Sequence, residues 1–355
     1  MGTIKILYGV VGEGMGHAMR SRVVLEHLLA QGHEIEIMAS SRGADFLAAR
    51  FRGVRRIHGF HIVYEENRMK LAATVRSNVV STAATLPANV SAYFELVDQF
   101  EPEVVVSDFE SWTYLYGKLH DLPVISVDNN QMLSRCDHPP EVTRPVLDFR
   151  LAQLFVRGKL PFCHHYVVST FFFPGACKRR TTLVPPILRP EILAARSTPG
   201  DHLLVYQTAE GNTGLARTLA GTGMECRIYG MRRGIQEEQV EGNLRYRPFD
   251  EAGFIADLAS ARAVIGGGSF TVMGEAVYLR KPMLSVPVGG QFEQVLNARW
   301  LERLGYGRHA ESLADPEVVH RFLNAVPACE DRLASYEQDG NRKLQETLDG
   351  LLAEL

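Results

Sequence analysis

The chain has 355 residues, of which 46% are hydrophobic and 22% charged, a balance typical of globular proteins rather than disordered ones. Its formal net charge of −3 gives no overall basic field of the kind that indicates nucleic-acid binding. No uncharged apolar run reaches the roughly 18 residues that cross a bilayer, and the N-terminus is typical of a first strand rather than of a signal peptide. We therefore expect a cytoplasmic protein, and its length favours two domains.

The cysteines are odd in number and widely spaced, and none of them forms a Cys-x-x-Cys pair. This pattern predicts neither a zinc site nor a disulfide framework, so we expect reduced thiols. They are Cys136, Cys163, Cys177, Cys226 and Cys329.

Short apolar runs alternate with amphipathic segments in the N-terminal half. Ile4–Tyr8 is a predicted strand, Ala18–Gln31 is a predicted helix that ends before Gly32, and Ile35–Ala39 is the next strand. Such alternation predicts a parallel sheet with right-handed crossovers. Further buried strands are predicted at Val104–Ser107, Val124–Val127 and Tyr166–Ser169.

A proline-rich segment, Thr182–Gly200, interrupts this pattern and is typical of an interdomain linker. A second alternating series follows it, so each half is predicted to form one doubly wound domain. The predicted strands of this second series are Leu203–Gln207, Cys226–Tyr229, Leu244–Tyr246, Ala263–Ile265 and Leu284–Val286.

These patterns place one domain at residues 1–185 and a second at 201–330, joined by a linker at 186–200. The polar residues 331–355 are predicted to form a C-terminal helix, which we expect to pack back towards the first domain.

The first predicted strand continues into a glycine-rich loop that contains Gly12, Glu13, Gly14 and Gly16. Ligands of open parallel sheets bind at the carboxyl ends of strands, and a helix N-terminus favours negative charge. The spacing is G-x-G-x-G rather than the G-x-G-x-x-G of dinucleotide-binding folds. We expect this loop to line a site; a purely structural turn is the alternative.

His17 follows this loop, and its imidazole, with an ordinary pKa of about 6.5, can accept a proton at neutral pH. A carboxylate commonly orients such a base. Asp108 follows Val104–Ser107 and should emerge at the same sheet edge. Glu13 and Glu110 are rival partners, and capping a helix is an alternative role for Asp108.

A second glycine turn, Gly266–Ser269, follows a predicted strand and precedes a helix. Free backbone N–H groups at a helix N-terminus form a cradle for a diphosphate. Glu275, about two turns further on, is placed to accept hydrogen bonds from both hydroxyls of a ribose. The turn alone is weak evidence, but the ordered set that extends through Lys281-Pro282 to Asn297-Ala298 is more specific.

This ordered set resembles the nucleotide-sugar site of GT-B glycosyltransferases, among them the UDP-glycosyltransferases and the lipid-intermediate N-acetylglucosaminyltransferase of peptidoglycan synthesis. Gly12–His17 resembles their N-terminal loop, Tyr206–Gly211 the first loop of the C-terminal domain, and Arg247–Phe249 the segment that faces the base. Within the superfamily the chain is most similar to an uncharacterised bacterial and archaeal group. The resemblance implies an α/β fold of two Rossmann-like domains facing each other across a cleft, the first binding the acceptor and the second the nucleotide-sugar.

The resemblance also implies an inverting hexosyl or N-acetylhexosaminyl transfer from a nucleoside-diphosphate sugar, first of all a UDP-sugar, to a hydroxyl acceptor. The chain has no Asp-x-Asp motif, so we expect no metal and no cofactor. The implied roles are general base for His17, supporting acid for Asp108, diphosphate binding for Thr208, Gly267, Gly268 and Ser269, ribose and base binding for Glu275 and Phe249, and sugar binding for Glu293 and Gln294.

Two positions depart from the family pattern. Gly266 or Gly267 stands where many UDP-glycosyltransferases have a histidine that contacts phosphate, and Glu293-Gln294 replaces an Asp-Gln pair. Because of both departures, the sequence does not identify the donor sugar. Because of the missing histidine, it does not identify the nucleotide either.

Three other functions compete with transfer. Nucleotide-sugar 2-epimerases share this architecture and bind the same donor. An NADP-dependent reductase would use the first glycine loop, with Ser40–Arg42 at the phosphate. A non-catalytic sensor would bind the nucleotide-sugar without turnover.

The acceptor is the least defined partner, with small molecules and lipid-linked compounds both open. Phe171–Pro174, followed by Lys178–Arg180, would suit weak peripheral contact with an anionic membrane. A buried strand end followed by a solvated turn is the alternative. Leu71–Tyr93 would serve as an acceptor-side helix or loop, or pack as ordinary core.

Overall fold

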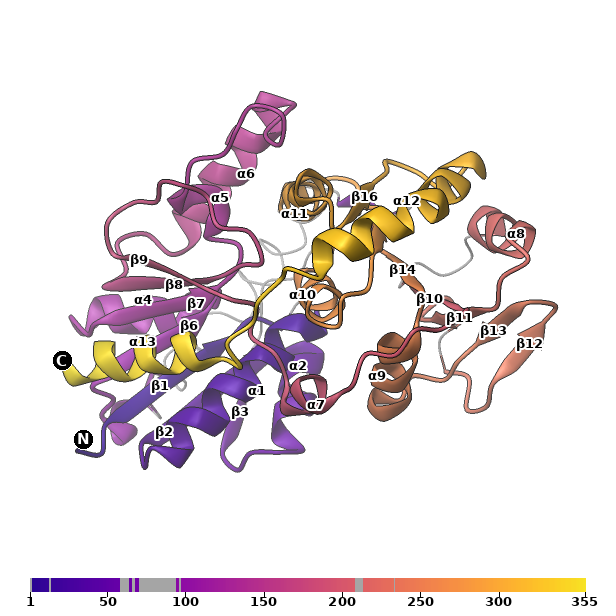
Figure 1. Ribbon diagram of the computed structural model, residues 1–355. Helices are drawn as coiled ribbons and strands as arrows, with labels where there is room; N and C mark the ends of the chain where they lie inside the picture. The colour runs from indigo at the N-terminus through magenta and orange to yellow at the C-terminus, as the bar shows by residue number, and fades with distance from the viewer. Residues whose placement is uncertain are drawn as a thin grey trace. The chain divides into compact units, whose positions relative to one another are not determined.

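Two seven-stranded sheets form the centres of two units of the chain (Figure 1). The computed structural model describes residues 2–12, 14–57, 64–65, 68–69, 94–95, 97–207, 213–232 and 234–355. Unit 1 comprises Met1–Pro139, Arg144–Arg189 and Asn341–Leu355, and unit 2 comprises Pro140–Thr143 and Pro190–Gly340.

The sheet of unit 1 has the order β3-β2-β1-β6-β7-β8-β9, and its strands pair in parallel. The chain starts in the middle, winds to one edge and then returns to build the other half, which is the doubly wound pattern. Buried apolar runs form the central strands, as the alternation predicts. The strands are β1 (Lys5–Val10), β2 (Glu34–Ser40), β3 (Val54–Ile57), β6 (Val104–Asp108), β7 (Val124–Asp128), β8 (His165–Ser169) and β9 (Thr181–Val184), and β4 (Tyr64–Glu65) pairs with β5 (Arg68–Met69) separately.

Helices cover this sheet, and the last of them comes from the C-terminus. Leu344, Leu348 and Leu352 are buried in the same apolar core as β1, and Asp349 Oδ1 lies 2.8 Å from His27 Nε2. The helices of unit 1 are α1 (Met15–Ala30), α2 (Ser41–Ala48), α4 (Ser111–Leu119), α5 (Met132–Arg135), α6 (Val146–Lys159) and α13 (Arg342–Ala353).

Unit 2 repeats this plan with the order β12-β13-β11-β10-β14-β15-β16. All its pairs are parallel except that of the edge strand β12 with β13. Its strands are β10 (Leu203–Tyr206), β11 (Cys226–Tyr229), β12 (Gln239–Glu241), β13 (Leu244–Tyr246), β14 (Ala263–Gly266), β15 (Met283–Ser285) and β16 (Gly307–His309), and its helices are α7 (Pro190–Ala194), α8 (Thr213–Gly221), α9 (Glu251–Ser260), α10 (Phe270–Tyr278), α11 (Phe292–Leu304) and α12 (Glu317–Leu333).

Two boundary predictions need correction. Residues 331–355 do not form one helix, because α12 ends at Leu333 and α13 begins at Arg342. The chain turns in between, with Asn341 in the left-handed conformation and its side chain bonded to the backbone of Leu188 at 2.8 and 3.0 Å. The proline-rich segment is also partly regular, since it contains most of β9 and all of α7.

The expectation of five reduced thiols is wrong for one pair. Cys136 and Cys177 form a disulfide, and the other three cysteines are free and buried. The two bonded residues also form an isolated antiparallel bridge between loops that are 41 positions apart. Sequence spacing carries no signal for such a long-range contact.

Two features bear on the predicted membrane contact. No helix in the described ranges is long and apolar enough to span a bilayer. Phe171 and Phe172 are 2% and 1% exposed, so the predicted contact is wrong for both, and only Phe173 is exposed. These two rings are buried after β8, as the alternative interpretation expected.

The predicted acceptor-side segment 71–93 lies outside the described residues.

Candidate active site

The glycine loop after β1 is shaped by its contact with the end of β2. The Gly12 N–H donates to Ser40 Oγ at 2.8 Å, and a Cβ on Gly12 would lie 2.1 Å from the Ser40 carbonyl oxygen. Gly14 precedes α1 with a φ of 88°, a conformation that favours glycine. Gly16 lies in the first turn of α1, and Glu13 is outside the described residues. Gly12 and Gly14 are therefore required by the local backbone, independently of any ligand.

His17 and Asp108 are brought together by the pairing of β1 with β6. The register sets Val10 beside Asp108, and the Val11 N–H donates to the Asp108 carbonyl at 3.2 Å. His17, in the first turn of α1, then lies with its Nδ1 2.8 Å from Asp108 Oδ1. The histidine side chain keeps 18% of its surface exposed, whereas that of Asp108 keeps 1%. The pair is thus anchored at the carboxylate and open at the imidazole.

Glu110, one of the two rival partners of His17, has the helix-capping role that was the alternative for Asp108. Glu110 caps α4, where its carboxylate accepts hydrogen bonds from the N–H groups of Trp112 and Thr113 at 2.8 and 2.7 Å. Asp108 is therefore not the helix cap, and Glu110 is committed to its own helix. Of the three candidate carboxylates, Asp108 is the one that contacts His17 among the described residues.

Sequence reasoning missed Arg20, the residue that completes this group. Its Nε and Nη2 donate to the two carboxylate oxygens of Asp108 at 2.8 and 2.5 Å. Its Nη1 donates to Asn129 Oδ1 at 2.5 Å, and Ser21 Oγ donates to Asp108 at 2.9 Å. Arg20 and Ser21 lie three and four positions after His17, which is the spacing that aligns side chains on one helix face. That spacing was the available signal.

The same contacts set the proton affinities. Burial alone would raise the pKa of Asp108, but the charges of Arg20 and His17 outweigh it and lower the pKa to about 2. Burial lowers the pKa of His17, and Arg20 lowers it further, against the raising effect of Asp108. At pH 7 the group therefore holds an ionised carboxylate beside a neutral imidazole.

The neutral imidazole has one tautomer that suits proton transfer. Arg20 Nη2, which is a donor only, lies 2.5 Å from both His17 Nδ1 and Asp108 Oδ1, and the tautomer of His17 decides whether it also donates to the imidazole. With its proton on Nδ1, His17 donates to the same carboxylate, and the lone pair stays on Nε2. This arrangement leaves Nε2 ready to accept a proton from a bound hydroxyl.

A second buried carboxylate, Asp128, lies close enough to Arg20 for their charges to interact. Asp128 ends β7, where it accepts hydrogen bonds from Ser126 Oγ at 2.7 Å and the Gln131 N–H at 2.8 Å. Burial raises its pKa to about 6, although Arg20 opposes the rise. Sequence reasoning placed this strand but did not consider Asp128 and Asn129, which leave the same sheet edge as Asp108.

An apolar wall with one cation adjoins the histidine. Phe109 follows Asp108 with a φ of 57°, and its ring meets that of Phe155 edge-on at 6.4 Å. Lys159 Nζ lies 4.1 Å from the centre of the Phe109 ring, and its charge contributes to the lowered pKa of His17.

In unit 2, the predicted diphosphate turn lies between β14 and α10. Gly268 is required by packing, since a Cβ there would lie 2.2 Å from Gln294 Cβ, whereas a Cβ on Gly267 would make only ordinary contacts at 3.8 Å. The Gly268 N–H donates to Gln294 Oε1 at 3.1 Å, so it is already used. Ser269 is the N-cap of α10 and makes no side-chain capping bond, and the first turn of α10 contains no acidic residue. An anion would therefore meet the N–H groups of Gly267, Ser269 and this first turn.

The predicted ribose and base residues differ in exposure. Glu275 is 1% exposed in the middle of α10. Phe249 follows β13 and is 57% exposed, with its ring edge-on to that of Tyr229 at 6.4 Å and tilted against that of Phe254 at 6.3 Å. An exposed ring supported by two others is suited to contact a flat base.

The predicted sugar-binding pair is engaged within the protein. Asn297 Nδ2 donates to Glu293 Oε1 at 2.5 Å. Gln294 Oε1 accepts from the N–H groups of Gly268 and Val288, the latter at 3.0 Å, and its amide also contacts Gln291. Gln294 thus joins the glycine turn to the loop after β15, a role that its sequence position does not reveal. Thr208 lies outside the described residues.

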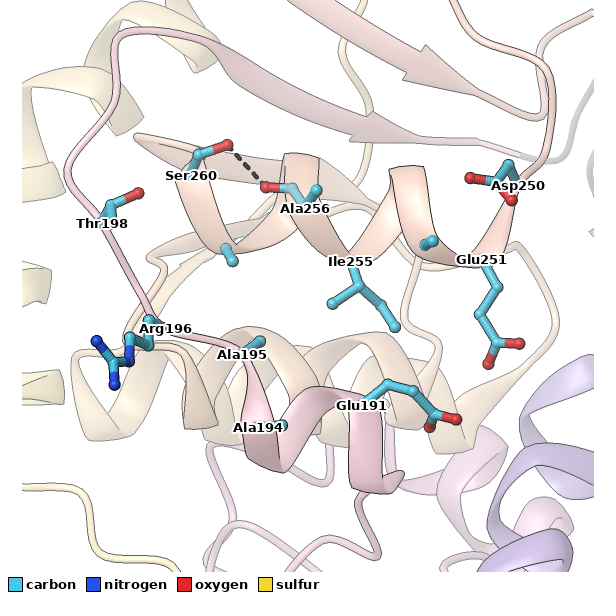
Figure 2. A pocket seen from close by; sticks show the side chains of 12 residues that line it. Glu191, Ala194, Ala195, Arg196, Thr198, Asp250, Glu251, Ile255, Ala256 and Ser260 are labelled. Atoms are coloured by element: carbon cyan, nitrogen blue, oxygen red, sulfur yellow. Dashed lines mark hydrogen bonds between the residues drawn. The ribbon is translucent and has the colours of Figure 1, made fainter.

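A separate pocket of about 650 Å³ lies elsewhere in unit 2 (Figure 2). Figure 2 shows α9 on one side and α7 with the following chain to Thr198 on the other, with alanine side chains and Ile255 between them. The carboxylates of Glu191 and Glu251 stand at the same end of the pocket. None of the residues predicted for catalysis or donor binding lines it.

Comparisons with known proteins agree on one class of enzyme. The model of the family described as glycosyl transferase family 1 matches residues 4–327. An uncharacterised glycosyltransferase of Methanosarcina mazei is 25% identical, and the match covers 98% of each chain.

Solved structures show the same fold. Phytolacca americana UGT2, complexed with UDP-2fluoro-glucose and pterostilbene, is 12% identical with a TM-score of 0.68 over the full length of both chains. Acinetobacter baumannii MurG is 15% identical with a TM-score of 0.63, covering 98% of this chain and 100% of that one. The predicted GT-B fold of two Rossmann-like domains is confirmed.

Proposed function

Since the chain belongs to glycosyl transferase family 1 and is a glycosyltransferase, we propose that it moves a sugar from a UDP-sugar to a hydroxyl acceptor with inversion at the anomeric carbon. The contact of His17 with Asp108, with Arg20 fixing the carboxylate, is the observation that carries this proposal. It supplies a neutral base that is oriented by an ionised acid.

The proposed reaction is a single displacement. His17 Nε2 takes the proton of the acceptor hydroxyl while its oxygen forms a bond to the anomeric carbon. The bond from that carbon to the phosphate oxygen breaks, and UDP leaves on the opposite face. Asp108 stabilises the imidazolium that forms, as carboxylates do for general-base histidines. His17 then releases its proton to solvent.

Unit 2 is the proposed donor-binding unit. The N–H groups around Gly267 and Ser269 would meet the charge that grows on the leaving diphosphate, which is where preorganised donors act most strongly. Phe249 would contact the base and Glu275 the ribose. The complex of a structural neighbour with UDP-2fluoro-glucose supports a UDP-sugar donor. We propose that no metal ion takes part.

Release of UDP from a panel of UDP-sugars, measured with a mixture of hydroxyl acceptors, tests this function. We expect release that depends on the acceptor, persists in excess EDTA, and gives a glycoside of inverted anomeric configuration by NMR coupling constants.

The same assay has outcomes that contradict the proposal. Retained configuration would exclude the single displacement. Loss of release in EDTA would exclude the metal-independent mechanism. Conversion of the UDP-sugar to its 2-epimer without any acceptor would identify an epimerase instead.

A further inference from the structure

Helix α6 of unit 1 carries its leucines on the outside. Leu147, Leu151 and Leu154 are 67%, 54% and 61% exposed, and their spacing places them on one face. Phe155, beside this stripe, is 50% exposed. A helix that packs on a core shows the opposite pattern, because its apolar stripe is the face it buries. The outward apolar face of α6 therefore needs a different explanation.

The other face of α6 attaches the helix to unit 1. Val156 is its one buried residue, and Gln153 Nε2 donates to the Leu133 carbonyl at 3.0 Å. The Phe149 ring meets that of His138 edge-on at 6.2 Å. Figure 1 shows α6 beside α5, projecting from the rest of unit 1. The helix is thus held in place by one narrow side while its leucine stripe points outward.

Basic side chains border this stripe. Arg150 and Arg157 are exposed on α6, one helical turn from its leucines, and Asp148 is the one acidic residue of the helix. Lys178 is a further exposed cation of unit 1, and desolvation and the charges of Arg157 and Arg135 lower its pKa. Lys178 Nζ donates to the Ser134 carbonyl at 2.6 Å, so the loop that carries it is fixed against α5.

We propose that α6 is a docking helix for an anionic lipid bilayer, with Leu147, Leu151, Leu154 and Phe155 inserted at the headgroup boundary. Helices that lie in a membrane interface combine an apolar face with basic residues, and anionic headgroups attract cations near the surface. Arg150 and Arg157 beside the leucines fit this partner by charge. They fit a second copy of the chain poorly, because two such helices would bring like charges together.

Co-sedimentation with lipid vesicles tests the docking without reference to the reaction. The full-length protein is mixed with vesicles of phosphatidylcholine and phosphatidylglycerol in equal parts, or of phosphatidylcholine alone. We expect binding to the anionic vesicles, a loss of more than tenfold in partitioning for Leu151→Glu/Leu154→Glu, and a loss of about fivefold for each arginine changed in Arg150→Gln/Arg157→Gln. Val240→Glu is the matched control, because Val240 on β12 is as exposed as Leu151, at 54%, and it should bind like the wild type.

Three results would overturn the proposal. The first is equal binding, or none, to both kinds of vesicle. The second is unchanged binding of the leucine double variant. The third is a concentration-dependent dimer that this variant converts to a monomer in light scattering, which would assign the stripe to a second copy of the chain. Since the leucines are exposed, the variant should fold, and its circular dichroism spectrum and melting temperature verify this.

Discussion

His17→Ala is expected to lower kcat by about 10²- to 10⁴-fold while the Kd for UDP stays within about twofold. The imidazole is the proposed proton acceptor, whereas the donor-binding residues belong to unit 2, so the base and the donor site should separate in the measurements. Acceptor-dependent UDP release gives kcat, and calorimetric titration gives the Kd.

His27→Ala is the matched control for this variant. His27 lies on the same helix and has a carboxylate partner of its own, Asp349, at 2.8 Å. This second pair joins α1 to α13 and takes no part in the proposed chemistry, so kcat should be unchanged even if the melting temperature falls. Equal losses in the two variants would show that α1 is merely sensitive to substitution, and unchanged turnover in His17→Ala would refute the base assignment.

Arg20→Gln is expected to lower the free energy of unfolding by about 3–5 kcal/mol, because it leaves the Asp108 carboxylate buried without its cation. The pKa of Asp108 is lowered on folding to about 2, so its stabilising contribution is present above pH ~4 and is lost as pH falls towards 2. Denaturant unfolding at pH 7 and pH 3 should therefore give a smaller difference between variant and wild type at the lower pH.

The same variant should also change the pH dependence of the reaction. Arg20 lowers the pKa of His17, so its removal leaves the raising effect of Asp108 and moves the acidic limb of kcat/KM to higher pH. A purely structural role for Arg20 would lower activity without moving this limb. Arg22→Gln is the control, since Arg22 on the same helix pairs with Glu26 at 2.7 Å and does not contact His17 or Asp108, so its loss should leave this limb where it is.

The alternation of apolar runs with helical segments predicted the five inner strands of each sheet, because parallel strands follow one another along the chain with their helices between them. The edge strands β3, β9, β12 and β16 were not predicted. The alternation was also sufficient to bring His17 and Asp108 to one edge. Arg20 was not predicted, although its spacing from His17 was visible, since a buried arginine is uncommon without a known partner. Asp128 was also missed. Its strand, β7, was predicted, but the polar residues that follow the apolar run were not considered as site residues.

Contacts between segments that are distant in the sequence could not be predicted from the sequence patterns. Gln294 could not be recognised as a partner of Gly268, because only the folded chain places α11 against the glycine turn. The Cys136–Cys177 disulfide depends on two loops meeting, which no spacing encodes. The leucines of α6 have ordinary helical periodicity, and only their exposure distinguishes them from a buried face.

A thermal-unfolding screen against UDP, GDP, dTDP, CMP and NADPH tests the central claim, a nucleoside-diphosphate donor site in unit 2, most directly. A ligand that binds only the folded state stabilises it by about 2.7 kcal/mol at a hundredfold excess over its Kd. We expect UDP to raise the melting temperature of the wild type and Glu275→Gln, which keeps the shape of the side chain, to lose most of this rise. A rise with NADPH alone, or with none of these ligands, would contradict the claim.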